Sequence, residues 1–242
     1  MDKKTIILIP ARMASTRFPG KPLAPIDGVP MVVYCARNAL KTNLEVFVCT
    51  DSKEINSVCN LYDVNSIMTP ECNTGTDRLA IACDQIDADY IINLQGDEPL
   101  IDEYSIKKII DYIPLLSDSE DLIINGITSI NSEEAFDPNN VKCAIIQEHE
   151  KVLYFSRKPL LNKAEQEQGN NYFKQIGLYA LSVKNLKKFA SLPQSNLEKA
   201  EKIEMLRWLE YGFSIKSCFL DCKNISVDTP HDLVEVIDRV TM

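Results

Sequence analysis

Three cations lie close together near the start of the chain, in the segment IPARMASTRFPGKPL (residues 9–23). Arg12, Arg17 and Lys21 have no carboxylate among them, although the whole chain carries 35 acidic residues against 26 basic ones. Guanidinium groups grip phosphate through paired hydrogen bonds, so this grouping favours a multiply charged phosphate as ligand. The segment is neither a G-x-x-x-x-G-K-[ST] loop nor a G-x-G-x-x-G loop. The alternative is a solvated basic loop whose cations pair with surface acids.

A carboxylate-rich turn, NLQGDEPLI (93–101), follows an apolar run and forms the second candidate group. Asp97 is expected at the end of a buried strand, where open α/β sheets bind ligands. Magnesium is typically held by one or two carboxylates together with phosphate oxygens, so Asp97 is a candidate metal ligand. Gly96 allows the backbone to approach a ligand closely. The alternative is a turn that only ends a strand.

Two further motifs each allow a structural and a functional interpretation. In TGTDR (74–78), either threonine can cap a helix, or Gly75 and Arg78 contact a nucleotide. In SVDTPHDL (226–233), Asp228 precedes a typical helix start with proline at the first helical position. Asp228 is therefore either part of that cap or a second metal carboxylate at the end of another strand.

Cations also occur in apolar runs of the second half of the chain. Lys142 lies in VKCAI, and Arg157 follows LYFS. A cation buried in a strand needs a partner, and we expect that partner to be an anionic ligand. Glu204 is a further candidate, with a simple structural alternative in an ion pair to Arg207 three residues along one helix.

The elements that must position these residues alternate regularly in the first half of the chain. Apolar, β-rich runs predict strands at 5–10, 45–50, 64–68 and 90–95, and helical patterns lie at 30–41, 53–61, 76–86 and 102–113. The strands are continuous apolar runs, as in a parallel sheet covered on both faces. This alternation predicts a doubly wound α/β sheet with its ligands at the carboxyl ends of the strands.

The second half has a looser pattern. Strands are expected at DLIINGITSI, VKCAIIQ, KVLYFS, YFKQIGLYALS and SIKSCFL, a polar loop at 162–171, one long helix over 196–212, and a final helix from Pro230. Because the chain has no repeats and no clean linker, we expect a single domain over 1–242. Residues 120–200 form an excursion from it rather than an independent unit.

The composition excludes several classes of partner and of site. A net charge of −9 argues against binding to nucleic acid or to a membrane surface, because both are polyanionic. No apolar run approaches the roughly 20 residues that span a bilayer. The eight cysteines form no CxxC, and there are only two histidines to complete a zinc site. We therefore expect reduced thiols in a cytoplasmic protein.

Taken in order, these motifs resemble those of the CMP-Kdo synthetases, the 3-deoxy-manno-octulosonate cytidylyltransferases. The resemblance rests on IPARMASTRFPGKPL, TGTDR, INLQGDEPLI, NNVKCAI, LYFSR, IGLYAL, LEKAEKIEMLRWLEYG and VDTP, and covers essentially the whole chain. It implies a Rossmann-like, three-layer nucleotide-diphospho-sugar transferase fold with a mostly parallel mixed sheet. It also implies a homodimer built partly from residues 120–200.

The resemblance implies an activity and assigns roles to residues. The family transfers CMP from CTP to the anomeric hydroxyl of Kdo, an acidic sugar of lipopolysaccharide or capsule, and releases pyrophosphate. By likeness, Arg12, Lys21 and Asp97 are catalytic, and the CTP contacts are Ser15, Arg17, Thr74, Gly75, Arg78 and Gln95. Mg²⁺ is expected on Asp97 and Asp228, and the sugar on Arg157, Gln175, Tyr179 and Glu204.

The chain departs from the family pattern only on the sugar side. Gln175 replaces the usual histidine, Met205 replaces the usual glutamine, and the stretch after Ser156 reads RKPLL. A methionine leaves a partner hydroxyl unpaired, so these changes predict a variant acidic sugar as acceptor in place of Kdo.

Two rival functions remain open on the sequence. One is a cytidylyltransferase acting on sialic acid or on another acid such as a phosphonate, with the same nucleotide half and a different acceptor. The other is a nucleotide-binding protein without catalysis. The retention of Lys21, Asp97 and Asp228 argues against the second, because binding alone does not require both metal carboxylates.

Overall fold

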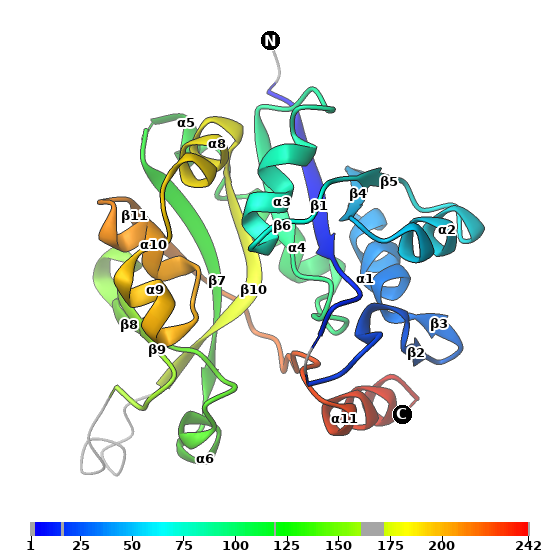
Figure 1. Ribbon diagram of the computed structural model, residues 1–242. Helices are drawn as coiled ribbons and strands as arrows, with labels where there is room; N and C mark the ends of the chain where they lie inside the picture. The colour runs from blue at the N-terminus through cyan, green and yellow to red at the C-terminus, as the bar shows by residue number, and fades with distance from the viewer. Residues whose placement is uncertain (1–2, 16, 119, 161–171, 242) are drawn as a thin grey trace.

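The computed structural model describes residues 3–15, 17–118, 120–160 and 172–241 (Figure 1). Within these residues, nine strands form one sheet in the order β5-β4-β1-β6-β10-β7-β11-β9-β8. They are β1 (Thr5–Ala11), β4 (Glu45–Thr50), β5 (Ser66–Met68), β6 (Tyr90–Leu94), β7 (Leu122–Ile130), β8 (Lys142–Ile146), β9 (Lys151–Ser156), β10 (Tyr172–Ser182) and β11 (Ser214–Phe219). All point one way except β9 and β10, which confirms the mostly parallel mixed sheet.

Helices cover both faces of the sheet. They are α1 (Met31–Leu40), α2 (Lys53–Leu61), α3 (Gly75–Ala82), α4 (Glu103–Ile110), α5 (Leu115–Asp118), α6 (Ser132–Phe136), α8 (Val183–Ser191), α9 (Asn196–Glu201), α10 (Met205–Glu210) and α11 (Pro230–Thr241). Short 3-10 turns η1 (Lys21–Leu23) and η2 (Gln147–His149) and the small hairpin β2 (Pro25–Ile26) and β3 (Val29–Pro30) complete the set.

Strand β1 shows why the fold has three layers. Its apolar residues alternate, so that Ile7 and Ile9 pack with α1, α2, α4 and α11, whereas Ile6 and Leu8 pack with α3, α8 and α10. All four side chains are fully buried. A strand covered on both faces needs the continuous apolar run that the sequence has there. The three-layer α/β prediction is confirmed.

Residues 120–200 continue the same sheet. Strand β10 lies between β6 and β7 and runs antiparallel to both (Figure 1). Strand β8 also reaches β10, where Lys142 pairs with Lys174, so that β10, β7, β11, β9 and β8 close into a ring. The polar loop expected at 162–171 lies outside the described residues. Strand β10 begins at Tyr172, as the sequence predicts.

The single helix predicted over 196–212 is wrong. Helix α9 ends at Glu201 and is followed by Lys202, a non-glycine residue in the left-handed region at φ 56°, and α10 begins only at Met205. Arg157 explains the break, because its side chain donates hydrogen bonds to the backbone carbonyls of Glu201 and Lys202 at the end of α9. The apolar spacing continues across the break, which is why the pattern reads as one helix.

Two expectations drawn from composition concern the state of the cysteines and the absence of a membrane-spanning segment. All eight cysteines are free thiols, and most of them are buried. Among the described helices, none has the length and apolar character needed to cross a membrane.

Candidate active site

A pocket of about 660 Å³ opens at the carboxyl ends of β1 and β6. Its walls come mainly from the segment after β1, the start of α3 and the turn after β6. Glu204 and Asp228, from the last part of the chain, complete them. Most of the predicted site residues line it: Arg12, Ser15, Arg17, Lys21, Thr74, Gly75, Arg78, Gln95, Asp97, Glu204 and Asp228. Three predicted residues do not, namely Arg157, Gln175 and Tyr179.

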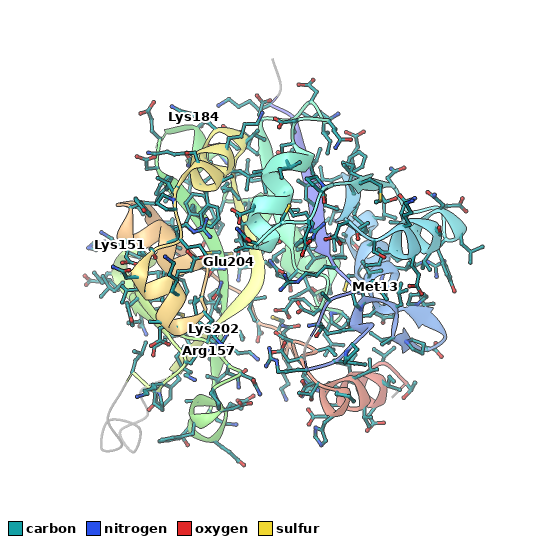
Figure 2. The ribbon with its side chains drawn as sticks, viewed as in Figure 1. Met13, Lys151, Arg157, Lys184, Lys202 and Glu204 are labelled. Carbon is teal, nitrogen blue, oxygen red and sulfur yellow. The ribbon has the colours of Figure 1, made fainter. Side chains whose placement is uncertain are left out.

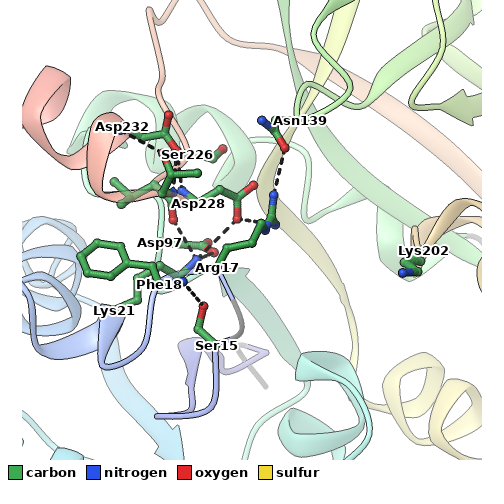
Figure 3. Close-up of polar contacts among 12 residues, drawn as sticks. Ser15, Arg17, Phe18, Lys21, Asp97, Asn139, Lys202, Ser226, Asp228 and Asp232 are labelled. Atoms are coloured by element: carbon green, nitrogen blue, oxygen red, sulfur yellow. Dashed lines mark hydrogen bonds and ion pairs between the residues drawn. The ribbon is translucent and has the colours of Figure 1, made fainter.

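Lys21 lies between the two carboxylates predicted to hold metal (Figure 3). Its Nζ is 2.6 Å from Asp97 Oδ2 and 3.6 Å from Asp228 Oδ1, and it donates a third bond to the Val227 carbonyl. Gly20, at φ 74°, provides the left-handed turn from which η1 starts at Lys21. Two carboxylates within reach of one ammonium group are also close enough to share a divalent cation.

The donor set fits magnesium. Among the described residues, no three carboxylate, histidine or cysteine side chains gather closely enough to hold a metal by themselves. Asp97 and Asp228 supply two oxygen ligands, and magnesium usually takes its remaining ligands from water and substrate phosphates. The cap of α11 does not use the Asp228 side chain: Thr229 Oγ1 accepts from the Asp232 N–H, and the Asp232 carboxylate accepts from the backbone N–H groups of Asp228 and Thr229. The Asp228 carboxylate is thus free to face the pocket.

The two arginines of the first segment differ in their partners. Arg17 donates to Asp228 Oδ1 at 2.8 Å and to Asn139 Oδ1 at 2.9 Å (Figure 3). Arg12 is exposed at the pocket wall, and its side chain has no polar partner among the described residues. The pocket therefore presents at least one unpaired cation to a ligand, as the absence of local acids predicts.

The start of α3 combines a structural and a pocket role. Thr74 caps the helix by accepting from the Asp77 backbone N–H, so the structural interpretation of this threonine is correct. Arg78 is only 2% exposed and donates to Thr69 and to Asp51, both at 2.7 Å. These two partners hold the Arg78 guanidinium in place where it lines the pocket.

A buried polar network lies beneath the pocket floor. The Tyr179 hydroxyl accepts from Asn93 and shares a hydrogen bond with Thr76 Oγ1, which in turn donates to Glu204. Burial raises the pKa of both the Glu204 carboxyl and the Tyr179 hydroxyl, so the tyrosine stays neutral. Figure 2 shows Glu204 near the centre of the molecule. The network joins α3, β6, β10 and the α9–α10 break.

Sequence reasoning missed two members of this network. Asn93 is a polar residue inside the otherwise apolar strand β6, and it is completely buried. A buried amide must find hydrogen-bond partners, so its place in the strand is a readable signal. Thr76 was considered only as a helix cap, and its link to Tyr179 spans 103 residues.

Arg157 binds the backbone rather than the pocket. Its guanidinium donates to the carbonyls of Glu201 at 2.9 Å, Pro138 at 2.9 Å and Lys202 at 3.3 Å. Figure 2 shows it beside Lys202. Lys142 behaves in the same way: it is fully buried and donates to the carbonyls of Asp137, Asn140 and Arg157. For Lys142, the expectation of an anionic ligand is wrong.

Two of the departures from the family pattern, Met205 and Gln175, do not line the pocket. Met205 is 2% exposed and packs in the core that contains Leu206 and Trp208, so it presents nothing to a ligand. Gln175 is half-buried on β10, where its backbone N–H donates to the Val141 carbonyl.

The alternative of a Glu204–Arg207 ion pair is wrong. Arg207 instead makes two bonds to Glu198, at 2.6 and 2.7 Å, and a weaker one to Asp77. This leaves the Glu204 carboxylate to the Thr76 network and the pocket.

Comparisons with known proteins agree with this geometry. The model of the cytidylyltransferase family matches residues 6–218. A 3-deoxy-manno-octulosonate cytidylyltransferase of Chlorobium limicola is 42% identical, over 94% of both chains. An 8-amino-3,8-dideoxy-manno-octulosonate cytidylyltransferase of Shewanella baltica is 38% identical, over 98% of both chains.

Solved structures give the same result. The structure of a CMP:2-keto-3-deoxy-manno-octonic acid synthetase complexed with CTP has a TM-score of 0.88 and 33% identity, over 98% of both chains. A putative glucose-1-phosphate thymidylyltransferase of Bacillus anthracis, at 15% identity and a TM-score of 0.68, shares the fold. The chain therefore belongs to the cytidylyltransferase family and is a nucleotidyltransferase.

Proposed function

We propose that the protein transfers CMP from CTP to the anomeric hydroxyl of an acidic sugar of the 3-deoxy-manno-octulosonate class. The observation that carries this proposal is the grouping of Lys21, Asp97 and Asp228 with Arg12 and Arg17 in one pocket. Relatives named for two sugars of this class, at 42% and 38% identity, support the choice of acceptor.

The reaction forms one bond and breaks one. The anomeric oxygen attacks the α-phosphorus of CTP, the bond from that phosphorus to the β-phosphate bridging oxygen breaks, and pyrophosphate leaves. The hydroxyl proton passes to solvent. Such a displacement needs positioning and charge neutralisation more than covalent participation of the protein. In this proposal Arg12 and Arg17 hold the triphosphate, and Lys21 neutralises charge beside the two carboxylates.

We propose Mg²⁺ as the cofactor, held by Asp97 and Asp228. When bound there, the ion supplies positive charge to the phosphates and orients the attacking hydroxyl. The residues around it do the remaining work: Arg78 and Thr74 keep the start of α3 in place, and the turn at Gln95 and Gly96 closes against β1. A Cβ on Gly96 would lie 3.0 Å from the Pro10 carbonyl oxygen, so this close contact favours glycine.

The test is release of pyrophosphate from CTP and Mg²⁺ with a panel of acceptors. The panel contains 3-deoxy-manno-octulosonate, its 8-amino-8-deoxy analogue, N-acetylneuraminate and a phosphonate. We expect the highest kcat/KM with one of the two octulosonates, and the ratio between them identifies the acceptor. Preference for N-acetylneuraminate or the phosphonate, or no turnover with any acceptor, would overturn the proposal.

We also propose a homodimer built partly from residues 120–200. Large apolar side chains are exposed in this region, among them Phe136, Ile146 and Leu153. Scattered singly they would need no explanation, but a subunit interface would bury them. Light scattering during size exclusion should give twice the mass of the chain, and a monomer at micromolar concentration contradicts this.

A further inference from the structure

Glu98 is a buried carboxylate at a junction of three segments that are distant in sequence. It is 4% exposed. Its Oε1 accepts from the Gly177 backbone N–H at 3.0 Å and from the Ser226 hydroxyl at 2.8 Å, and its Oε2 accepts from the Asn224 amide. All three partners are donors, and an ionised carboxylate is the side chain that only accepts. The pocket chemistry described above does not use this residue.

The first link of Glu98 fixes the place of Asp228 relative to Asp97. Ser226 and Asn224 precede Asp228 by two and four residues, and Glu98 directly follows Asp97. The Val227 backbone N–H also donates to the Asp97 carbonyl at 2.9 Å. Three hydrogen bonds thus attach the segment before Asp228 to the turn that carries Asp97. Figure 3 shows the contacts of Lys21 with Asp97 and of Arg17 with Asp228, on the two segments that these bonds join.

The second link of Glu98 reaches strand β10. The pairing of β10 with β7 shifts its register between Gln175 and Tyr179, a bulge centred on Gly177. The Gly177 N–H donates to Glu98 Oε1, and the Gly177 carbonyl accepts from the Gln95 N–H at 2.8 Å. A Cβ on Gly177 would lie 2.6 Å from Glu98 Oε1, so only glycine allows this approach. The bulge is therefore docked on the same turn that carries Asp97.

We propose that Glu98 is a positioning residue that sets the separation of Asp97 and Asp228 and attaches this carboxylate pair to β10. The inference rests on the proposed magnesium-dependent reaction. It assigns to Glu98 no contact with substrate or metal. Its effect passes through Ser226 and Asn224 to Asp228, and through its own backbone to Asp97. Residues that orient metal ligands in this way typically change metal affinity 10- to 100-fold when altered.

The sharpest test removes one hydroxyl, in Ser226→Ala, with Ser217→Ala as the matched control. Ser217 is 3% exposed on β11, and its hydroxyl donates to the Glu150 carbonyl, away from the pocket. The readout is calorimetric binding of CTP at increasing Mg²⁺, beside CTP binding in EDTA and the thermal midpoint. We expect Ser226→Ala to raise the Mg²⁺ concentration for half-maximal enhancement about tenfold. Ser217→Ala should stay within about twofold of wild type, and CTP binding in EDTA should be unchanged in both.

Two substitutions at Glu98 distinguish the loss of its hydrogen bonds from the loss of its negative charge. Glu98→Ala removes all three links and should raise the Mg²⁺ requirement more than Ser226→Ala does. Glu98→Gln should lie nearer wild type, because Asn224 Oδ1 has no hydrogen-bond partner among the described residues and can accept from the new amide after rotation. The proposal is overturned by a Mg²⁺ dependence of Ser226→Ala and Glu98→Ala equal to that of Ser217→Ala, or by Glu98→Gln as impaired as Glu98→Ala.

The failure of this inference can be told apart from failure of the proposed function. If wild-type protein binds CTP with Mg²⁺ enhancement but the variants keep the wild-type Mg²⁺ requirement, only the role of Glu98 is overturned. If the wild-type protein shows no Mg²⁺ enhancement of CTP binding, the carboxylate pair has no metal to hold, and both proposals are overturned.

Discussion

The two sides of the molecule use their charged residues differently. On the nucleotide side, around β1, α3 and β6, Lys21 and Arg17 pair with the side chains of Asp97 and Asp228. On the side to which the family resemblance assigns the acceptor sugar, here called the acceptor side and formed by β8 to β10, Arg157 and Lys142 donate to backbone carbonyls. Side-chain partners can be exchanged for a phosphate and a metal ion by rotation alone. Backbone partners cannot be released without disturbing the fold.

This difference gives a rule for interpreting a buried or half-buried cation. A cation whose partners are carboxylates in a pocket, or which has none, as Arg12, belongs to the machinery that binds ligand. A cation that saturates carbonyls at the ends of strands and helices belongs to the fold, because those carbonyls would otherwise lack donors. The rule predicts that substitutions on the nucleotide side change activity, and that those of Arg157 and Lys142 change stability.

The largest effect is expected from Asp97→Asn. Loss of this carboxylate should lower turnover by about 100- to 1000-fold, because charge stabilisation in the transition state is lost. CTP binding without Mg²⁺ should be unchanged or tighter, since Lys21 loses its partner at 2.6 Å and is free for phosphate. Pyrophosphate release and calorimetry measure the two quantities. Asp84→Asn, at an exposed pair with Lys187, is the control. Equal losses of turnover and of CTP binding would mean that Asp97 contributes to CTP binding and not to the chemical step.

The next effect is expected from Arg12→Ala. Because Arg12 has no polar partner among the described residues and lines the pocket, its removal should weaken CTP binding about tenfold, with the urea midpoint unchanged. Arg37→Ala is the control, since Arg37, on α1, lies over the ring of Tyr62. This variant should bind CTP with the wild-type affinity. A rise in acceptor KM with unchanged CTP affinity would instead assign Arg12 to the acceptor side.

Elements governed by local pattern were predictable from the sequence. The helix at 53–61 and the strands at 151–156 and 172–182 agree with the structure at both ends. Capping residues, turn signals and apolar runs act within a few residues, so one sequence contains them. Helix α8 (Val183–Ser191) was missed, although Ser182 caps it by accepting from the Asn185 N–H. Ser182 is also the last residue of β10, so no turn separates the strand from the helix.

Features governed by distant partners were not predictable. The helix break at Lys202 depends on Arg157, 45 residues away, and the network around Glu98 joins residues 79 to 128 apart. Candidates on the nucleotide side came together because parallel strands bring their carboxyl ends to one edge. On the acceptor side no such rule applies, so the roles that the family resemblance assigns to Arg157, Gln175 and Tyr179 stay predictions.

A smaller effect, on stability rather than turnover, is expected from Arg157→Ala. Loss of three hydrogen bonds to carbonyls should lower the free energy of unfolding by about 2 kcal/mol, since the site is open enough for water to replace part of each bond. Urea denaturation measures this, and turnover at saturating acceptor should change less than threefold. Arg157→Lys, which retains the charge but not the fork, should recover part of the stability. A large rise in acceptor KM with unchanged stability would contradict this difference between the two sides. It would mean that Arg157 contacts the acceptor sugar.

The smallest effect is a pH dependence at Glu204, the buried carboxylate between α9 and α10 that lines the pocket. Burial raises the pKa of its carboxyl above the ordinary 4.5; Asp77 adds to this shift, while the Thr76 bonds and Arg207 oppose it. Below that ordinary value, folded and unfolded chains both hold the proton. As pH rises toward the folded-state pKa, the unfolded chain releases its proton first, so the free energy of unfolding falls and then levels off.

Glu204→Gln removes this titration while its carbonyl oxygen can still accept from Thr76. We expect the variant and the wild type to unfold alike near pH 4, and the variant to become the more stable of the two as pH rises to neutrality. Urea denaturation at a series of pH values measures the difference, with Glu71→Gln, at an exposed carboxyl, as the control. A difference that is the same at every pH would mean that the Glu204 carboxyl ionises as freely in the folded protein as in the unfolded chain. In that case the pocket floor is solvated, and the contrast between the two sides of the molecule lies in hydrogen-bond partners alone.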